Sequence, residues 1–226
     1  MESFTITSKK VLTLVLVIDK VEQKVLLGYK KRGFGAHLWN GFGGKVEPGE
    51  TTREGALREL EEEAGITVMS EDFKKAGVLL FQFENDSVAL ETHVYKAYEY
   101  QGQIRECEEM RPQWFTFADV PYDQMWEDDR IWLPMLLNGQ DPFYGRMYFK
   151  RKPVEDTKED EATAAPVLNT STSTHVNHST TMTGTSFSAA QPKSGPFAMC
   201  DYQLEHGLQG VPREIALDGT IASFES

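Results

Sequence analysis

The fold is decided by residues 44–66, which read GKVEPGETTREGALRELEEEAGI. Thr51 followed by Glu54 forms a capping box, in which each side chain binds the backbone N–H of the other residue at the start of a helix. Gly65 readily takes the left-handed backbone conformation that ends a helix. The sequence therefore predicts a helix over residues 52–64.

The predicted helix has two faces of different character. At about 100° per residue, Leu57, Leu60 and Ala64 fall on one narrow apolar stripe, which we expect to pack on a sheet. A separate arc carries three acidic residues, Glu59, Glu62 and Glu63. Like charges at this spacing repel, and a hard cation with oxygen ligands, such as Mg²⁺, would compensate the repulsion. On the helix alone, a solvated acidic face is favoured over a metal site.

The full spacing of the segment favours the metal site. The pattern Gly-x5-Glu-x7-Arg-Glu-Leu-x-Glu-Glu-x-Gly-Ile resembles the signature of the Nudix hydrolases at every defined position. The resemblance implies an α/β (α+β) Nudix fold, a mixed β-sheet sandwiched between helices. It also implies cleavage of a nucleoside diphosphate linked to another group.

The same resemblance implies roles for individual residues. The metal ligands would be the Gly43 carbonyl with Glu59, Glu62, Glu63 and Glu109, and the metal Mg²⁺, with Mn²⁺ as a substitute. The catalytic residues would be Arg58, Glu59, Glu63 and Glu109. We expect Arg58 to orient a glutamate through a bidentate pair, although a surface salt bridge is an open alternative. Which glutamate is the general base stays open.

Further segments resemble the subgroup of Nudix hydrolases that act on oxidised purine nucleoside triphosphates. The match covers nearly all of residues 11–150 and is carried by TLVLV at 13–17, KKRGFGA at 30–36, WNGFGGK at 39–45, EMRP at 109–112 and MWEDD at 125–129. It implies hydrolysis of 8-oxo-dGTP and 2-oxo-dATP to monophosphate and pyrophosphate, which would keep damaged bases out of DNA. The alternatives are hydrolysis of methylated purine triphosphates or dinucleoside polyphosphates, and a nucleotide-binding module without catalysis.

The residues in these segments suit a purine pocket. Phe34 and Trp126 offer flat faces that would sandwich or edge-pack a base, and Asn40 can donate and accept hydrogen bonds. Burial would keep a proton on one of the adjacent acids Asp128 and Asp129, so that one donates while the other accepts. The remaining predicted substrate-binding residues are Thr13, Lys30, Phe42, Gly43, Gly44 and Lys45.

Some aromatic residues and one departure from the family pattern are harder to interpret. Trp132 is expected in the core, whereas Phe81 and Phe83 suit the core and the pocket equally. Glu127 stands where the subgroup usually has proline, and we expect it to loosen the turn that sets Asp128.

Composition limits the classes of partner. The 226 residues carry 23 basic and 35 acidic side chains, a net charge of −12, which argues against a protein that binds nucleic acid through a basic face. The longest apolar run, residues 11–18, is far shorter than the roughly 20 residues that span a bilayer. Two cysteines fit a reducing compartment. We expect a soluble monomer with a small-molecule nucleotide substrate and no nucleic-acid or membrane partner, in the cytoplasm with the nucleus or mitochondria as further locations.

The chain divides by composition near residue 153. We predict a Nudix domain over 1–152, a disordered Ser/Thr-rich insertion over 153–196, a last strand over 197–206 that pairs with residues 143–150, and an extension over 207–226. A floppy tail from 153 onward is the alternative. A second helix is predicted over 129–137, and strands over 12–18, 24–31, 78–84, 88–100, 112–117 and 143–150.

Overall fold

The computed structural model describes residues 6–152 and 197–206, all of which belong to one compact unit. The predicted insertion over 153–196 and the extension over 207–226 lie outside the described residues, so those two interpretations stay predictions.

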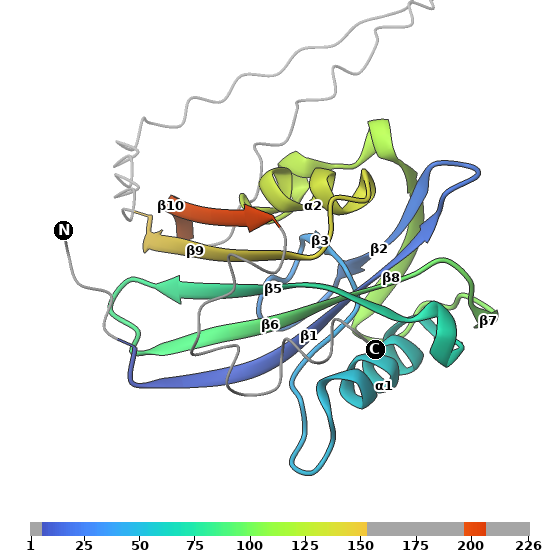
Figure 1. Ribbon diagram of the computed structural model, residues 1–226, viewed down its shortest axis with the longest axis horizontal. Helices are drawn as coiled ribbons and strands as arrows, with labels where there is room; N and C mark the ends of the chain where they lie inside the picture. The colour runs from blue at the N-terminus through green and yellow to red at the C-terminus, as the bar shows by residue number, and fades with distance from the viewer. Residues whose placement is uncertain (1–5, 153–196, 207–226) are drawn as a thin grey trace, which may run out of the picture. The chain divides into compact units, whose positions relative to one another are not determined.

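The described residues form a mixed sheet of eight strands and a separate two-stranded sheet, β4–β7. The large sheet has the order β10-β9-β5-β6-β1-β2-β3, and β8 also pairs with β2 (Figure 1). The β1–β6 and β5–β9 pairs are parallel, and the other pairs are antiparallel. The elements are β1 Ser8–Asp19, β2 Lys24–Lys30, β3 Trp39–Asn40, α1 Thr52–Ala64, β4 Ile66–Thr67, η1 Ser70–Asp72, β5 Lys74–Phe83, β6 Val88–Ala97, β7 Gln101–Gly102, β8 Met110–Thr116, η2 Phe117–Asp119, η3 Tyr122–Gln124, α2 Asp129–Leu137, β9 Phe143–Arg151 and β10 Phe197–His206.

Both α-helices have the predicted bounds. The capping box of Thr51 and Glu54 is present at the start of α1, and Gly65 ends the helix in the left-handed conformation with φ 73°. The second helix, α2, contains Pro134 in its interior. Neither helix, nor any other in the described part of the chain, has the length and apolar character needed to cross a membrane.

The strand predicted at the far end of the chain does pair with the domain. Residues of β10 run antiparallel to β9 from the Phe197–Arg151 pair to the His206–Phe143 pair, with an irregularity between Met199 and Asp201. The prediction that residues 197–206 return to pair with residues 143–150 is therefore confirmed.

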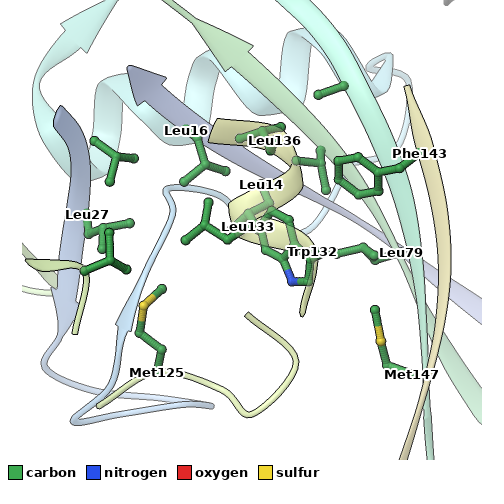
Figure 2. Packing of buried hydrophobic residues seen from close by; sticks show 14 of the residues in the cluster. Leu14, Leu16, Leu27, Leu79, Met125, Trp132, Leu133, Leu136, Phe143 and Met147 are labelled. Atoms are coloured by element: carbon green, nitrogen blue, oxygen red, sulfur yellow. The ribbon is translucent and has the colours of Figure 1, made fainter. Parts of the chain in front are cut away.

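One face of β1 packs against α2. Leu14 and Leu16 belong to the same buried cluster as three residues of α2 (Figure 2). These are Trp132, Leu133 and Leu136. Ile18 belongs to this cluster as well. Trp132 is 1% exposed, so its prediction as a core residue is confirmed.

The other face of β1 packs against α1. Val15 and Val17 share a second buried cluster with Ala56, Leu60 and Ala64 of α1. The two helices therefore cover opposite faces of the sheet, and a strand buried on both faces reads as a continuous apolar run.

The differences from the predicted elements lie in the strands and in three short 3-10 helices, η1, η2 and η3, which were not predicted. β1 begins at Ser8 instead of residue 12, and β5 begins at Lys74 instead of residue 78. β6 ends at Ala97 instead of residue 100, and β8 begins at Met110 instead of residue 112. The two-residue strands β3, β4 and β7 were not predicted. A strand of two residues is too short to show the alternation by which strands are predicted.

Candidate active site

A cavity of about 610 Å³ brings the acidic arc of α1 and the predicted base-binding residues together. It is lined by every predicted site residue except Phe42. These are Thr13, Lys30, Phe34, Asn40, Gly43, Gly44, Lys45, Arg58, Glu59, Glu62, Glu63, Glu109, Trp126, Asp128 and Asp129.

Phe42 corrects the predicted substrate-binding set. Its side chain is fully buried in the cluster beneath α1. The backbone of Phe42 pairs with Val15, accepting a hydrogen bond of 2.6 Å from Val15 N–H and donating one of 3.0 Å to its carbonyl. Successive side chains of an extended segment point to opposite faces, so pairing with Val15 turns Phe42 toward α1 and away from the cavity.

Two glycines allow the loop before α1 to lie close to its neighbours. A side chain at Gly43 would collide with the backbone carbonyl of Thr13, and one at Gly44 would collide with the carboxylate of Glu59. Gly43 N–H donates to Glu63 Oε2 at 2.8 Å. The glycines therefore hold two carboxylates of α1 directly against the loop backbone.

Arg58 does form a bidentate pair, and its partner is Glu50. Its Nε and Nη2 atoms lie 3.1 and 2.8 Å from the two Glu50 oxygens. Its Nη1 atom also donates to Glu59 at 3.1 Å and to Glu62 at 3.3 Å. The predicted bidentate pair is present, but Glu50 had been given no role. The signal that could have found Glu50 is its fixed position in the 44–66 pattern.

Lys30 connects two further carboxylates. Its Nζ lies 2.7 Å from Glu109 and 3.9 Å from Glu63. Glu63 is 5% exposed, and this burial raises its pKa to about 7 against the opposing effects of Gly43 N–H and Lys30. Burial also raises the pKa of Glu59. These glutamates therefore need positive charge nearby to stay ionised.

The base end of the cavity contains a pair of buried acids that no cation contacts within the described residues. Asp128 is 2% and Asp129 3% exposed. Trp132 Nε1 donates to Asp128 Oδ2 at 2.9 Å, and Trp126 N–H donates to Asp129 Oδ2 at 3.0 Å. Asp128 Oδ1 is buried without a hydrogen-bond partner in the described part of the chain, as is the Thr13 hydroxyl.

Burial raises the pKa of both aspartates. The pKa of Asp128 rises to about 6, and the pKa of Asp129 rises well above its ordinary value because the charge of Asp128 adds to the effect of burial. At neutral pH the pair therefore holds one proton, which leaves one carboxyl as a donor and the other as an acceptor.

Of the two predicted arrangements of the aromatic walls, a sandwich or edge packing of the base, the structure excludes the sandwich. Phe34 and Trp126 stack directly on each other, with ring centroids 5.1 Å apart and an angle of 26° between the ring planes. A base cannot lie between rings at this separation, so it would contact one exposed face, and Phe34 is 60% exposed. Phe81 and Phe83 belong to the core and also line the cavity, so both interpretations of these residues hold.

Glu127, which stands where proline is usual in the subgroup, contacts two distant parts of the chain. Its Oε2 accepts a hydrogen bond of 2.8 Å from Met199 N–H on β10, and its Oε1 lies 3.6 Å from Lys152 Nζ. Proline has no side-chain acceptor for such a hydrogen bond.

Other residues of the cavity wall were not predicted. Leu90 and Thr92 of β6, with Leu12 and Leu14 of β1, line it, and so does Phe149 of β9. Leu90 and Thr92 occupy alternate positions of one strand, and the same spacing relates Leu12 and Leu14. This period of two was visible, but which face of each strand borders the cavity depends on the order of strands in the sheet.

The comparisons agree with this geometry. A model of the NUDIX domain matches residues 9–136. The chain is 48% identical over 143 residues to an oxidized purine nucleoside triphosphate hydrolase of Danio rerio, covering 63% of this chain and 87% of that protein. It is 44% identical over 144 residues to the protein of the same name in Mus musculus, covering 64% of this chain and 89% of that protein. A crystal structure of a MutT protein from Bacillus halodurans aligns with a TM-score of 0.55 at 26% identity, covering 62% and 90%.

The fold and the cavity thus define a hydrolase with an acidic helix at one end of a nucleotide-sized cleft. The chain belongs to the Nudix family.

The acidic end of the cavity fits a divalent cation in its donor chemistry. Nudix hydrolases generally use divalent metal ions, and carboxylate oxygens are the ligands that hard cations prefer. In the described residues no three acidic, histidine or cysteine side chains lie close enough together to hold a metal ion. Arg58 and Lys30 form ion pairs with these carboxylates. Because glycine has no side chain, Gly44 lets the carboxylate of Glu59 lie close to the loop backbone. This close approach suits a cation held between the helix and the loop.

Proposed function

We propose that this chain hydrolyses oxidised purine nucleoside triphosphates to the monophosphate and pyrophosphate, and thereby removes damaged nucleotides from the pool that polymerases use. The names of the two animal relatives support this substrate class. The observation that carries it is the buried Asp128–Asp129 pair in the same cavity as the acidic arc of α1.

The aspartate pair recognises the base. A guanine-type edge presents a carbonyl together with N–H groups, and a carboxyl pair with one proton complements both kinds of group. Moving the proton from one aspartate to the other would fit an oxidised adenine. The unpartnered Asp128 Oδ1 is available for such a hydrogen bond, since leaving a buried polar atom without one is costly.

The acidic end handles the phosphates. Glu59, Glu62, Glu63 and Glu109 would hold Mg²⁺ or Mn²⁺, which polarises phosphoryl oxygens and lowers the pKa of an attacking water. Arg58 orients Glu59 and Glu62, because its Nη1 atom donates to both. Lys30 and Lys45 line the same cavity and place positive charge beside the phosphates.

The partners and location follow from composition rather than from the site. We propose a monomer that acts on a small-molecule nucleotide, with no nucleic-acid or membrane partner, in the cytoplasm and also in the nucleus or mitochondria.

A panel of nucleotides tests the function. Purified protein with Mg²⁺ is given 8-oxo-dGTP, 2-oxo-dATP, a methylated purine triphosphate, a dinucleoside polyphosphate and unmodified dGTP, and pyrophosphate release is measured with and without EDTA. We expect the largest kcat/KM with an oxidised purine triphosphate and no turnover in EDTA. A larger kcat/KM with the methylated purine or the dinucleoside polyphosphate would refute the proposed substrate.

A further inference from the structure

The turn that carries the base-reading residues is held by a side chain between them. Glu127 lies between Trp126, whose ring lines the cavity, and Asp128, whose Oδ1 has no partner among the described residues. Neither oxygen of Glu127 enters the cavity lining. One oxygen accepts the N–H of Met199 at 2.8 Å, and the other lies 3.6 Å from Lys152. The carboxylate therefore connects the turn to β10 and to the residue that follows β9.

The contact joins parts of the chain that the sequence separates widely. Met199 is on β10, the strand that ends the sheet and pairs with β9 (Figure 1). The strand's hydrogen bonds with β9 become irregular between Met199 and Asp201. An edge strand has N–H groups that no neighbouring strand accepts. The Glu127 carboxylate accepts one of them, and a hydrogen bond to a charged acceptor is stronger than one between neutral groups.

A second, apolar contact ties the same strand to the same pocket. Phe197 at the start of β10 packs edge-on against Phe83 with ring centroids 4.9 Å apart. Phe83 in turn lies 5.9 Å from Phe34, which stacks on Trp126. Displacement of β10 would therefore reach Trp126 by two routes, through Glu127 on one side and through the aromatic rings on the other.

We propose that Glu127 is a positioning residue of the base pocket: by accepting the Met199 N–H it fixes the turn that carries Trp126 and Asp128 to β10. This role rests on the proposed function for the identity of the ligand. The affinity of the pocket for the base then depends on β10 being in place, although no residue of the acidic end contacts that strand in the described part of the chain.

Two substitutions separate the hydrogen bond from the charge. Glu127→Ala removes the acceptor, whereas Glu127→Gln keeps an oxygen that can accept the Met199 N–H. The matched control is Glu71→Ala, which removes an exposed acid that lies outside the cavity lining. Thermal unfolding of each variant checks that it is folded.

The first readout is binding of 8-oxo-dGMP in EDTA, which needs no catalysis. For Glu127→Ala we expect Kd to rise by about 10-fold, the effect of losing one charge-assisted hydrogen bond. Glu127→Gln should stay within about 3-fold of the unmodified protein, and Glu71→Ala should not differ from it. Wild-type affinity in Glu127→Ala, an equal loss in Glu127→Gln, or no binding by the unmodified protein would each overturn the role of Glu127.

The second readout is steady-state turnover of 8-oxo-dGTP with Mg²⁺. We expect KM to rise in Glu127→Ala while kcat at saturation stays within about 3-fold, because the acidic end is untouched. A fall in kcat without a change in KM would overturn the proposal. If the unmodified protein binds 8-oxo-dGMP but does not turn over 8-oxo-dGTP, the proposed function fails and the binding series still decides the role of Glu127.

Discussion

The two ends of the cavity hold acidic side chains in opposite ways. At the α1 end, Glu59, Glu62 and Glu63 lie beside Arg58 and Lys30, which compensate their charge. At the base end, Asp128 and Asp129 have no cation in contact with them among the described residues, and their hydrogen bonds come from Trp132 and from the Trp126 backbone. In the first group Lys30 and Arg58 oppose the effect of burial, which still raises the pKa of Glu63 to about 7, whereas in the second group burial raises both pKa values with no cation to oppose it.

The difference shows how one cavity can serve two kinds of chemistry. An ionised carboxylate can bind a metal ion, and the metal ion can contact phosphate oxygens. A buried carboxylic acid can instead donate a hydrogen bond to a base. Substitutions at the α1 end should therefore leave affinity for the base nearly unchanged, and substitutions at the base end should leave kcat nearly unchanged. The four predictions below test that separation in order of expected size.

The largest effect is expected at the α1 end. Glu63→Gln should lower kcat for 8-oxo-dGTP by about 10³-fold, because Glu63 is buried at the centre of the acidic cluster and its charge cannot be replaced by an amide. Binding of 8-oxo-dGMP in EDTA should be unchanged. The control is Glu61→Gln, since Glu61 is exposed on the same helix. Retained turnover in Glu63→Gln would exclude this residue from catalysis.

The second effect is expected at the base end. Asp128→Asn should lower kcat/KM for 8-oxo-dGTP by about 10²-fold, because an amide cannot alternate between donor and acceptor as a carboxyl pair does. The loss with unmodified dGTP should be much smaller. Asp123→Asn, at an 86% exposed side chain paired with Arg130, is the control. Equal losses with both nucleotides would remove Asp128 from base recognition.

The third effect is a pH dependence confined to the base end. Below a pKa of about 6 Asp128 takes up a proton and stops being an acceptor, so affinity for the base should fall as the pH falls. Between pH 7 and pH 5 we expect Kd for 8-oxo-deoxyguanosine to rise by about 10-fold. The nucleoside is used because it has no phosphate to titrate. Asp128→Asn should abolish the dependence, and a dependence that persists in that variant would assign it to another group.

The smallest effect is expected at the rim. Phe34→Ala should weaken 8-oxo-dGMP binding by about 5-fold, the low end of base stacking, because Phe34 is 60% exposed and one of its faces lies on Trp126. Phe34→Leu keeps apolar area, so its affinity for 8-oxo-dGMP should lie between that of the unmodified protein and that of Phe34→Ala. The turnover number kcat should not change in either variant. A loss of affinity as large as that of Asp128→Asn would indicate that Phe34 encloses the base.

Local signals account for what could be predicted of the fold. The ends of α1 followed from Thr51, Glu54 and Gly65, which act within a few residues of each other. The burial of β1 on both faces followed from an uninterrupted apolar run. The short strands escaped prediction because their pairing, such as Ile66 with Gly102, is made with a distant segment.

The site shows the same limit. Every site residue named by the family resemblance except Phe42 lines the cavity, because a motif fixes both residue types and their spacing. The resemblance misplaced the side chain of Phe42, since the direction of that residue depends on its pairing with Val15. It also gave no role to Glu50 and did not predict the contact of Glu127 with Met199, since the partners of these two glutamates lie 8 and 72 residues away.

The sequence by itself determined the family, the acidic arc of α1 and the pair of adjacent aspartates, because each is encoded within one short segment. Only the tertiary structure decided that Arg58 pairs with Glu50, that Phe34 stacks on Trp126, and that β10 holds the turn before Asp128 through Glu127. These contacts join side chains whose directions are set by packing and strand order. The pattern over residues 44–66 fixes the positions of Glu50 and Arg58 in the sequence, but not that their side chains meet.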